Sequence, residues 1–282
     1  MNPSTNQSIQ QVDIKKIFYE KNPRLARLLP GFIYTYLRRI AHEDFINKLL
    51  REYGHLKGLD FANAMIKEFN VHIVTEGEEN LPKEGRFIFV SNHPLGGFDG
   101  QIIMHLVARH YGGFKFLVND ILMNLRNLST VFIPINKHGR QGIELAERID
   151  ATFRSNDQIL TFPAGYVSRR VKGQIVDLEW QKSFITKARQ YQRDVIPIHM
   201  GGRNSEFFYR LGTIRKKLSI KANIEMLYLI DETYKHRNKT IVVKFGQPIP
   251  WQTFDHSKKP IEWARWVKEK VYLLDGVRTI PL

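Results

Sequence analysis

The chain has 282 residues, of which 43% are hydrophobic and 12% aromatic, and it carries a formal net charge of +15. This is enough apolar material for a sizeable core, so the composition excludes a chain that is disordered throughout. The absence of cysteine excludes disulfides, iron–sulfur clusters and a thiol nucleophile. The N-terminal segment lacks the apolar core of a secretory signal, and no stretch approaches the ~18 uninterrupted apolar residues that span a bilayer. We therefore expect a cytoplasmic protein without a transmembrane helix.

The first 70 residues contain only helical patterns. A proline and a glycine at positions 30 and 31 interrupt them, which predicts two helical pieces with Pro30 near the start of the second. A basic helix with a wide apolar face either lies in a membrane interface or packs on the body of the protein, and both fates can coexist along one stripe. Residues 1–70 are thus interpreted as an N-terminal helical segment that can associate with a membrane. The apolar stripe consists of Leu25, Leu28, Leu29, Phe32, Ile33, Tyr36, Leu37 and Ile40, accompanied by Arg24, Arg27, Arg38 and Arg39.

From residue 71 onward, short apolar runs typical of strands alternate with helical patterns. Several runs are apolar at both alternating sets of positions, as in strands that are buried on both faces. The alternation predicts an α/β domain over residues 71–282, with helices on both faces of a sheet. The strand candidates are 71–76, 86–91, 114–118, 130–135, 158–162, 194–200, 226–230 and 240–245. The helix candidates are 99–110, 140–154, 178–192, 204–217 and 260–273.

The stretch "FVSNHPLGGFDG" (89–100) combines a buried strand with polar residues at its end. Asn92 and His93 fall at the carboxyl end of the strand, where open α/β sheets bind their ligands. Gly96 and Gly97 allow a tight return of the chain. This end of the sheet is therefore the candidate site.

Asp99 stands where the following helix needs an N-cap. Its carboxylate is also able to accept the Nδ1 proton of His93, which leaves Nε2 to take a proton from a substrate hydroxyl. No G-x-S-x-G serine is present, so the nucleophile would be the substrate's own hydroxyl. The alternative is that Asp99 only caps the helix and His93 is a hydrogen-bonded histidine at a strand end.

At this point the motifs resemble a known family. "NHPLGGFD" (92–99) resembles the Asn-His-x-x-x-x-Asp signature of the lysophosphatidic acid/glycerolipid acyltransferase superfamily. Three further blocks follow in that family's order: "VFIPIN" (131–136) resembles F-I-x-R, "TFPAGYVS" (161–168) resembles F-P-E-G-T-R-S, and "VIPIHMGG" (195–202) resembles the V-I-P-V block. Four blocks over residues 89–202 carry the resemblance. It implies a mixed central sheet flanked by helices, with His93 and Asp99 as catalytic residues.

The departures from the family pattern bear on the substrate. Five residues separate His93 from Asp99 where the family has four, and this proline- and glycine-containing version is similar to the hemolysin-like branch, which includes O-acyltransferases of ornithine and glycine lipids. The arginine of F-I-x-R falls on Asn136, and the glutamate of F-P-E-G falls on Ala164. Losing that arginine removes a bidentate phosphate donor, which favours an acceptor without a glycerol phosphate.

Cations near these motifs are candidates for binding the carboxylate of such an acceptor, namely Lys137, Arg140, Arg169 and Arg170. The alternative for each of them is an ordinary surface charge. Gly165 either exposes its N–H to the substrate or only forms a turn. The expected substrate-binding residues are Asn92, Gly96, Gly97, Asn136, Lys137, Arg140, Pro163, Gly165, Arg169 and Arg170.

The resemblance implies a membrane-peripheral O-acyltransferase on the inner face of the cytoplasmic membrane. It would move a fatty acyl group from an acyl carrier protein or coenzyme A thioester to a lysolipid hydroxyl, with no metal or other cofactor. A lyso-amino-acid lipid of the glycine or ornithine type is the expected acceptor, and lysophosphatidic acid is the alternative. Two other functions remain open, a hydrolase that uses water as acceptor and a non-catalytic protein that binds anionic membranes.

The positive charge of the chain agrees with a polyanionic partner. Nucleic acid would favour aromatic residues interleaved with basic ones on a recognisable module, and the sequence contains no such module. The basic clusters 215–217 and 235–239 are candidate contacts with an anionic membrane surface or an acidic carrier protein. Solvated loops are the alternative for both clusters.

Overall fold

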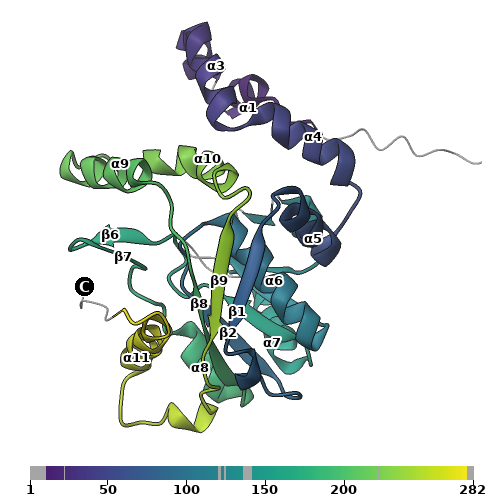
Figure 1. Ribbon diagram of the computed structural model, residues 1–282, viewed down its shortest axis with the longest axis vertical. Helices are drawn as coiled ribbons and strands as arrows, with labels where there is room; N and C mark the ends of the chain where they lie inside the picture. Colours follow the sequence, from purple (N-terminus) through teal and green to yellow (C-terminus); the bar gives the residue numbers. More distant parts are fainter. Residues whose placement is uncertain are drawn as a thin grey trace, which may run out of the picture.

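A computed structural model describes residues 11–21, 23–119, 122–123, 125–135, 142–221 and 223–277. Its centre is a seven-stranded sheet of order β1-β9-β8-β2-β5-β3-β4 (Figure 1). Strands β8, β2, β5, β3 and β4 are parallel to one another, whereas β9 is antiparallel to β8 and parallel to β1. The sheet is therefore mixed, and the α/β prediction is confirmed. The strands are β1 (His72–Glu76), β2 (Phe87–Ser91), β3 (Phe114–Asn119), β4 (Phe132–Ile135), β5 (Gln158–Thr161), β8 (Asp194–Met200) and β9 (Thr240–Phe245).

Helices cover both faces of this sheet. Phe87 and Phe89 of β2 face the core that includes α5 (Gly58–Glu68) and α6 (Gly97–Tyr111). The alternate residues Ile88 and Val90 face a second core with the helices α7 (Ile143–Arg154), α8 (Ser183–Tyr191) and α11 (Pro260–Leu273). All five residues of β2 are buried. The apolar run therefore reflects a central strand that buries side chains on both faces.

The N-terminal part is helical, as predicted. It comprises α1 (Ile14–Lys21), α2 (Pro23–Leu28), α3 (Gly31–Ile40) and α4 (Glu43–Tyr53), followed by α5 on the body. Pro30 is the N-cap of α3, which confirms the predicted break. Figure 1 shows α1, α3 and α4 standing above the sheet, whereas α5 packs beside α6. No helix in the described part of the chain is both long and apolar enough to cross a membrane.

The predicted stripe has two fates. Ile40 is buried, whereas the side chains of Leu28 and Phe32 are 79% and 71% exposed. Part of the stripe therefore packs on the protein and part of it faces solvent.

A segment that we call the arm follows β8, and it consists of α9 (Glu206–Lys217), the 3₁₀ helix η4 (Ile224–Tyr228) and α10 (Leu229–Tyr234). The predicted strand at 226–230 is wrong, because these residues form the end of η4 and the start of α10. A short apolar run fits a buried strand and a helix equally well, so periodicity does not separate the two. Here Leu227 and Ile230 are exposed while Glu225 is buried, which is a helical distribution.

A two-stranded hairpin that the sequence reasoning missed lies beside the arm. It pairs β6 (Arg169–Val171) with β7 (Gln174–Val176) in antiparallel register. The two linking residues, Lys172 and Gly173, both have positive φ, as in the tight turns that suit a twisted hairpin.

Candidate active site

The site is built at the carboxyl end of β2, between β8 and β5. Asn92 directly follows the strand and is buried. Its side-chain Nδ2 donates to the carbonyl of Met200 (2.9 Å), and its Oδ1 accepts the N–H of Met200 (2.7 Å). The side chain thus fastens the loop to the end of β8. Asn92 was expected to bind substrate, but both ends of its amide group contact the protein backbone.

The next turn brings His93 and Asp99 together. Asp99 Oδ2 accepts hydrogen bonds from His93 Nδ1 (2.9 Å), from the N–H of Leu95 (2.9 Å) and from the N–H of Gly96 (3.1 Å). Gly96 has a φ of 82°, which side-chain-bearing residues rarely adopt. A Cβ there would also come within 2.7 Å of Leu229 Cδ1 on the arm. This glycine accommodates the five-residue spacing.

Burial determines the electrostatics of the pair. Asp99 is fully buried, and burial raises the pKa of its carboxyl while the hydrogen bond from His93 opposes that rise. An ionised carboxylate only accepts, so Nδ1 of His93 carries the hydrogen and Nε2 has its lone pair available. No hydrogen bond joins Nε2 to another residue of the described ranges. The pair therefore has the arrangement of a general base held by a carboxylate.

Phe162 forms one wall of the site. Its ring stacks on the imidazole of His93, with centroids 4.0 Å apart and planes 15° apart. The N–H of Gly165 donates to the Phe162 carbonyl (2.9 Å), and the Pro163 carbonyl accepts from the N–H of Gln181 (3.0 Å). The main-chain groups of this block thus shape the turn that presents Phe162. The Gly165 amide is therefore directed at a carbonyl within its own turn.

A second buried carboxylate supports the main chain of His93. Asp177 Oδ1 accepts the N–H of His93 (3.2 Å) and the hydroxyl of Ser168 (2.6 Å), and Oδ2 accepts Trp180 Nε1 (2.9 Å). The N–H of Ser168 donates in turn to the His93 carbonyl (2.8 Å). Lys268 Nζ donates to the Asp177 carbonyl (2.7 Å). His93 is thus held at both of its backbone polar groups.

The sequence did not predict this support. Asp177 directly follows Ile175 and Val176 and lies three residues before Trp180. Nothing in the sequence relates it to His93, which is 84 residues away.

The two described candidate cations differ in their surroundings. Arg169 is buried, and its guanidinium lies 3.5 Å from Glu225 and over the ring of Phe208. Burial lowers its pKa, and Nη1 is a buried donor without a hydrogen-bond partner in the described structure. Arg170 is more exposed and donates to Glu206 (2.7 Å). Asn136, Lys137 and Arg140 lie outside the described residues.

The start of α6 completes the site. Gly97 and Phe98 are its first two residues, so their N–H groups have no acceptor one turn earlier within the helix. Gly97 is exposed, and no atom lies within 4 Å of the position of a Cβ there. The positive end of the α6 helix is therefore exposed at Gly97, four residues after His93 in the chain.

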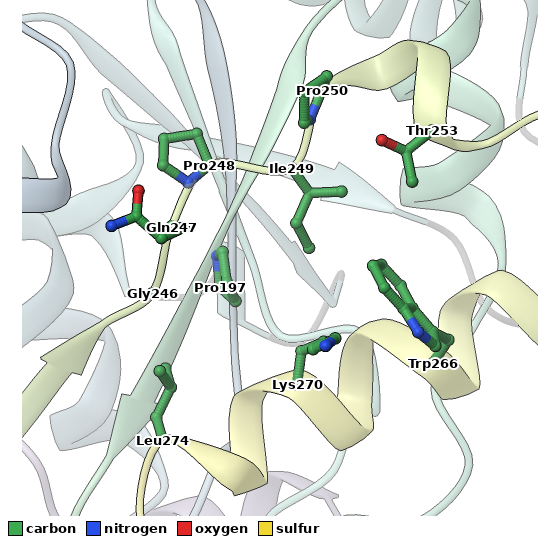
Figure 2. A pocket seen from close by; sticks show the side chains of 10 residues that line it. All are labelled: Pro197, Gly246, Gln247, Pro248, Ile249, Pro250, Thr253, Trp266, Lys270 and Leu274. Carbon is green, nitrogen blue, oxygen red and sulfur yellow. The ribbon is translucent and has the colours of Figure 1, made fainter.

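A cavity of about 290 Å³ lies elsewhere, on the α11 side of the sheet. Figure 2 shows Trp266 and Lys270 of α11 facing Pro197 of β8 and the segment that follows β9. The cavity shares no residue with the His93–Asp99 pair.

Comparison with known proteins agrees with the family that the motifs predicted. A profile of the acyltransferase family matches residues 16–278. The chain is 50% identical over 271 residues to a lyso-glycine lipid O-acyltransferase of Bacteroides thetaiotaomicron, covering 96% of this chain and 100% of that one. It is 46% identical over 271 residues to a lyso-glycine lipid O-acyltransferase of Phocaeicola vulgatus, covering 96% and 97%.

Among solved structures, the 1-acyl-sn-glycerophosphate acyltransferase of Thermotoga maritima matches 87% of this chain and 96% of its own, with a TM-score of 0.47 and 17% identity. The family match and the two relatives span almost the whole chain. The chain therefore belongs to the acyltransferase family and is an acyltransferase.

Proposed function

We propose that the protein is a membrane-peripheral O-acyltransferase that transfers a fatty acyl group from a thioester to the hydroxyl of a lyso-glycine lipid. The observation that carries this proposal is the His93–Asp99 pair, which presents an unengaged Nε2 at the carboxyl edge of the sheet. Its two relatives with 50% and 46% identity are named lyso-glycine lipid O-acyltransferases. Since this function needs no cofactor, the proposed mechanism uses only the chain and its two substrates.

In the proposed reaction, Nε2 of His93 takes the proton of the acceptor hydroxyl as that oxygen attacks the thioester carbonyl carbon. The new C–O bond forms, the C–S bond breaks, and the imidazolium returns its proton to the leaving thiolate. Asp99 holds the ring through Nδ1 and stabilises its positive charge, while Phe162 covers one face of the ring. The products are a diacylated lipid and a thiol.

The oxyanion of the tetrahedral intermediate needs donors beside the imidazole. We place it at the N–H groups of Gly97 and Phe98, because these start a helix and Gly97 faces open space. The other candidate amides already have acceptors: Leu95 and Gly96 donate to Asp99, and Gly165 donates to Phe162. One such donor typically contributes ~3 kcal/mol to the transition state.

The acceptor's carboxylate needs a cation near the site. Arg169 is the favoured one, because Ser168 beside it binds the His93 carbonyl and because its Nη1 has no hydrogen-bond partner in the described structure. Its planar guanidinium matches a carboxylate with two parallel hydrogen bonds. The thioester is carried by an acyl carrier protein or by coenzyme A, and the enzyme works at the inner face of the cytoplasmic membrane.

The test is acyl transfer from labelled acyl-carrier and coenzyme A thioesters, with lyso-glycine lipid and lysophosphatidic acid offered in parallel. We expect transfer to the lyso-glycine lipid, and a loss of at least ~10³-fold in His93→Ala. His256→Ala, at an exposed histidine, is the matched control and should keep the parental rate. Transfer to lysophosphatidic acid alone would refute the acceptor. Parental turnover by His93→Ala would refute the general base.

A further inference from the structure

Large apolar side chains are exposed on two segments that are far apart in the sequence. On α3, Phe32 and Tyr36 are 71% and 45% exposed. On the arm, the exposed apolar residues include two from α9, the C-cap residue of that helix and one from η4. We call this set the apolar face, and it consists of Phe32, Tyr36, Phe207, Ile214, Leu218 and Leu227.

The periodicity of α9 separates its exposed apolar side chains from its core. Phe207, Ile214 and Leu218 are spaced by seven and four residues, so they form one stripe along the helix and its C-cap. Phe208 and Tyr209 of the same helix are buried. This helix therefore buries one apolar face within the protein and exposes another.

Side-chain contacts join the two segments. The hydroxyls of Tyr36 and Tyr228 are 2.5 Å apart, and the ring of Phe207 packs edge-on against Tyr228 with centroids 4.9 Å apart. Beyond the C-terminal end of α3, His42 Nε2 lies 2.8 Å from Asp231 Oδ1 of α10. Figure 1 shows α9 and α10 at the edge of the body that faces α1, α3 and α4. The exposed side chains of α3 and of the arm are therefore neighbours.

The charges beside the apolar face are mainly positive, and the exposed Glu206 of α9 is paired with Arg170 and Arg203. Arg210 and Lys217 are exposed on α9 and lie beside its apolar stripe. On α3, Arg39 lies seven residues after Phe32 and therefore on the same side of the helix. Apolar side chains flanked by arginine and lysine suit an anionic bilayer, where the apolar groups enter the acyl boundary and the cations meet the lipid phosphates. We propose that the apolar face inserts into an anionic bilayer and that α3 and the arm bind it as one surface.

The arm also borders the candidate active site. Leu229 packs over Gly96 in the turn that carries Asp99, and Met226 Sδ accepts a hydrogen bond from Arg169. A lipid that leaves the bilayer beside the arm would thus arrive next to His93. This delivery depends on the proposed function, whereas bilayer binding does not.

The experiment measures binding of the full-length protein to vesicles of phosphatidylglycerol and phosphatidylcholine by flotation. The variant Ile214→Glu/Leu218→Glu should bind at least ~30-fold more weakly, since it removes two inserted side chains and adds two negative charges. Leu273→Glu is the matched control, because Leu273 is 49% exposed on α11, and it should bind like the parent. Phe32→Glu should weaken binding too, since α3 shares the surface. A thermal melt shows that each variant is folded.

Unchanged vesicle binding by the folded double variant would overturn the proposal. The proposal would also be overturned if the double variant lost binding to an acidic acyl carrier protein but still bound vesicles, because the apolar face would then be a docking site for the carrier protein. If the double variant and the parent acylate a short-chain, monomeric lyso-glycine lipid at the same rate, the result would support a role of the apolar face in bilayer binding alone. If the parent transfers no acyl group but binds vesicles, and the double variant does not bind them, the proposed function is refuted and the proposed membrane contact of the apolar face is supported.

Discussion

The substitution Asp99→Asn separates the charge of Asp99 from its hydrogen bonds. All three donors to this side chain converge on Oδ2, whereas Oδ1 is buried without a hydrogen-bond partner in the described structure. An asparagine can place its amide oxygen at the Oδ2 position and its NH₂ group at the Oδ1 position. The N–H groups of Leu95 and Gly96 favour that orientation, so the turn and the His93 tautomer should both survive.

The carboxylate charge, in contrast, is lost. Two unit charges about 4 Å apart interact by about 4 kcal/mol at an effective dielectric constant of ~20, which sets the stabilisation of the imidazolium by Asp99. We therefore expect kcat to fall ~10³-fold, since each ~1.4 kcal/mol is a factor of ten. The buried NH₂ without an acceptor should cost only ~1–3 kcal/mol of unfolding free energy.

The assay combines steady-state acyl transfer with urea unfolding of the same preparations. Asp99→Ala is the comparison, because it also removes the three hydrogen bonds of the turn and should lose more stability than Asp99→Asn. Turnover by Asp99→Asn within ~10-fold of the parent would show that the charge of Asp99 does not act on the imidazolium. Unfolding of the asparagine variant at the same urea concentration as the alanine variant would contradict the proposed amide orientation.

Three further predictions concern residues around the site and the arm. Asp177→Asn replaces one acceptor oxygen by an NH₂ group, which then faces either the donor of Trp180 or the donors of His93 and Ser168. Urea unfolding should therefore show a loss of ~2–4 kcal/mol in the free energy of unfolding, and an unchanged midpoint would contradict the support of His93. Arg169→Lys keeps the charge but not the fork, so KM for the lyso-glycine lipid should rise ~10-fold while KM for the thioester stays constant; equal changes in both would mean a purely structural role. Burial lowers the pKa of His236 to about 4. At pH values between this pKa and the ordinary pKa of histidine, the unfolded chain therefore binds one proton more than the folded chain. The stability of the fold thus decreases as the pH drops through this range. This pKa shift is worth up to ~3 kcal/mol, so His236→Gln should reduce the difference in unfolding free energy between pH 7.5 and pH 4. An equally large difference in the variant and the parent would contradict this role of His236.

The sequence predicted features that depend on short-range patterns. Ile88 and Val90 belong to residues 87–90, which are all aromatic or β-branched, and this composition favours a buried strand over a helix. The pairing of His93 with Asp99 was predictable because six residues and a glycine turn bring the two together. Pro30 marked the start of α3 for an equally local reason, its fixed φ and missing N–H.

The features that were missed depend on contacts between distant segments. The run at 226–230 is helical because the arm packs through Glu225 and Leu229, with Arg169 and Arg215 paired to Glu225. The role of Asp177 depends on a loop that returns to His93 after 84 residues. No local pattern in a single sequence contains such information, because the partners are chosen by the packed fold.

The amide clip of Asn92 has a consequence for hydrogen exchange. Met200 is the last residue of β8, where amides ordinarily exchange through fraying of the strand end. Here its N–H donates to Asn92 Oδ1 and the residue is fully buried. Its protection should therefore approach that of the central strands, with exchange only when the whole sheet opens. The loop that bears His93 would then share the slowest-opening unit of the molecule, although it lies at the rim of the sheet.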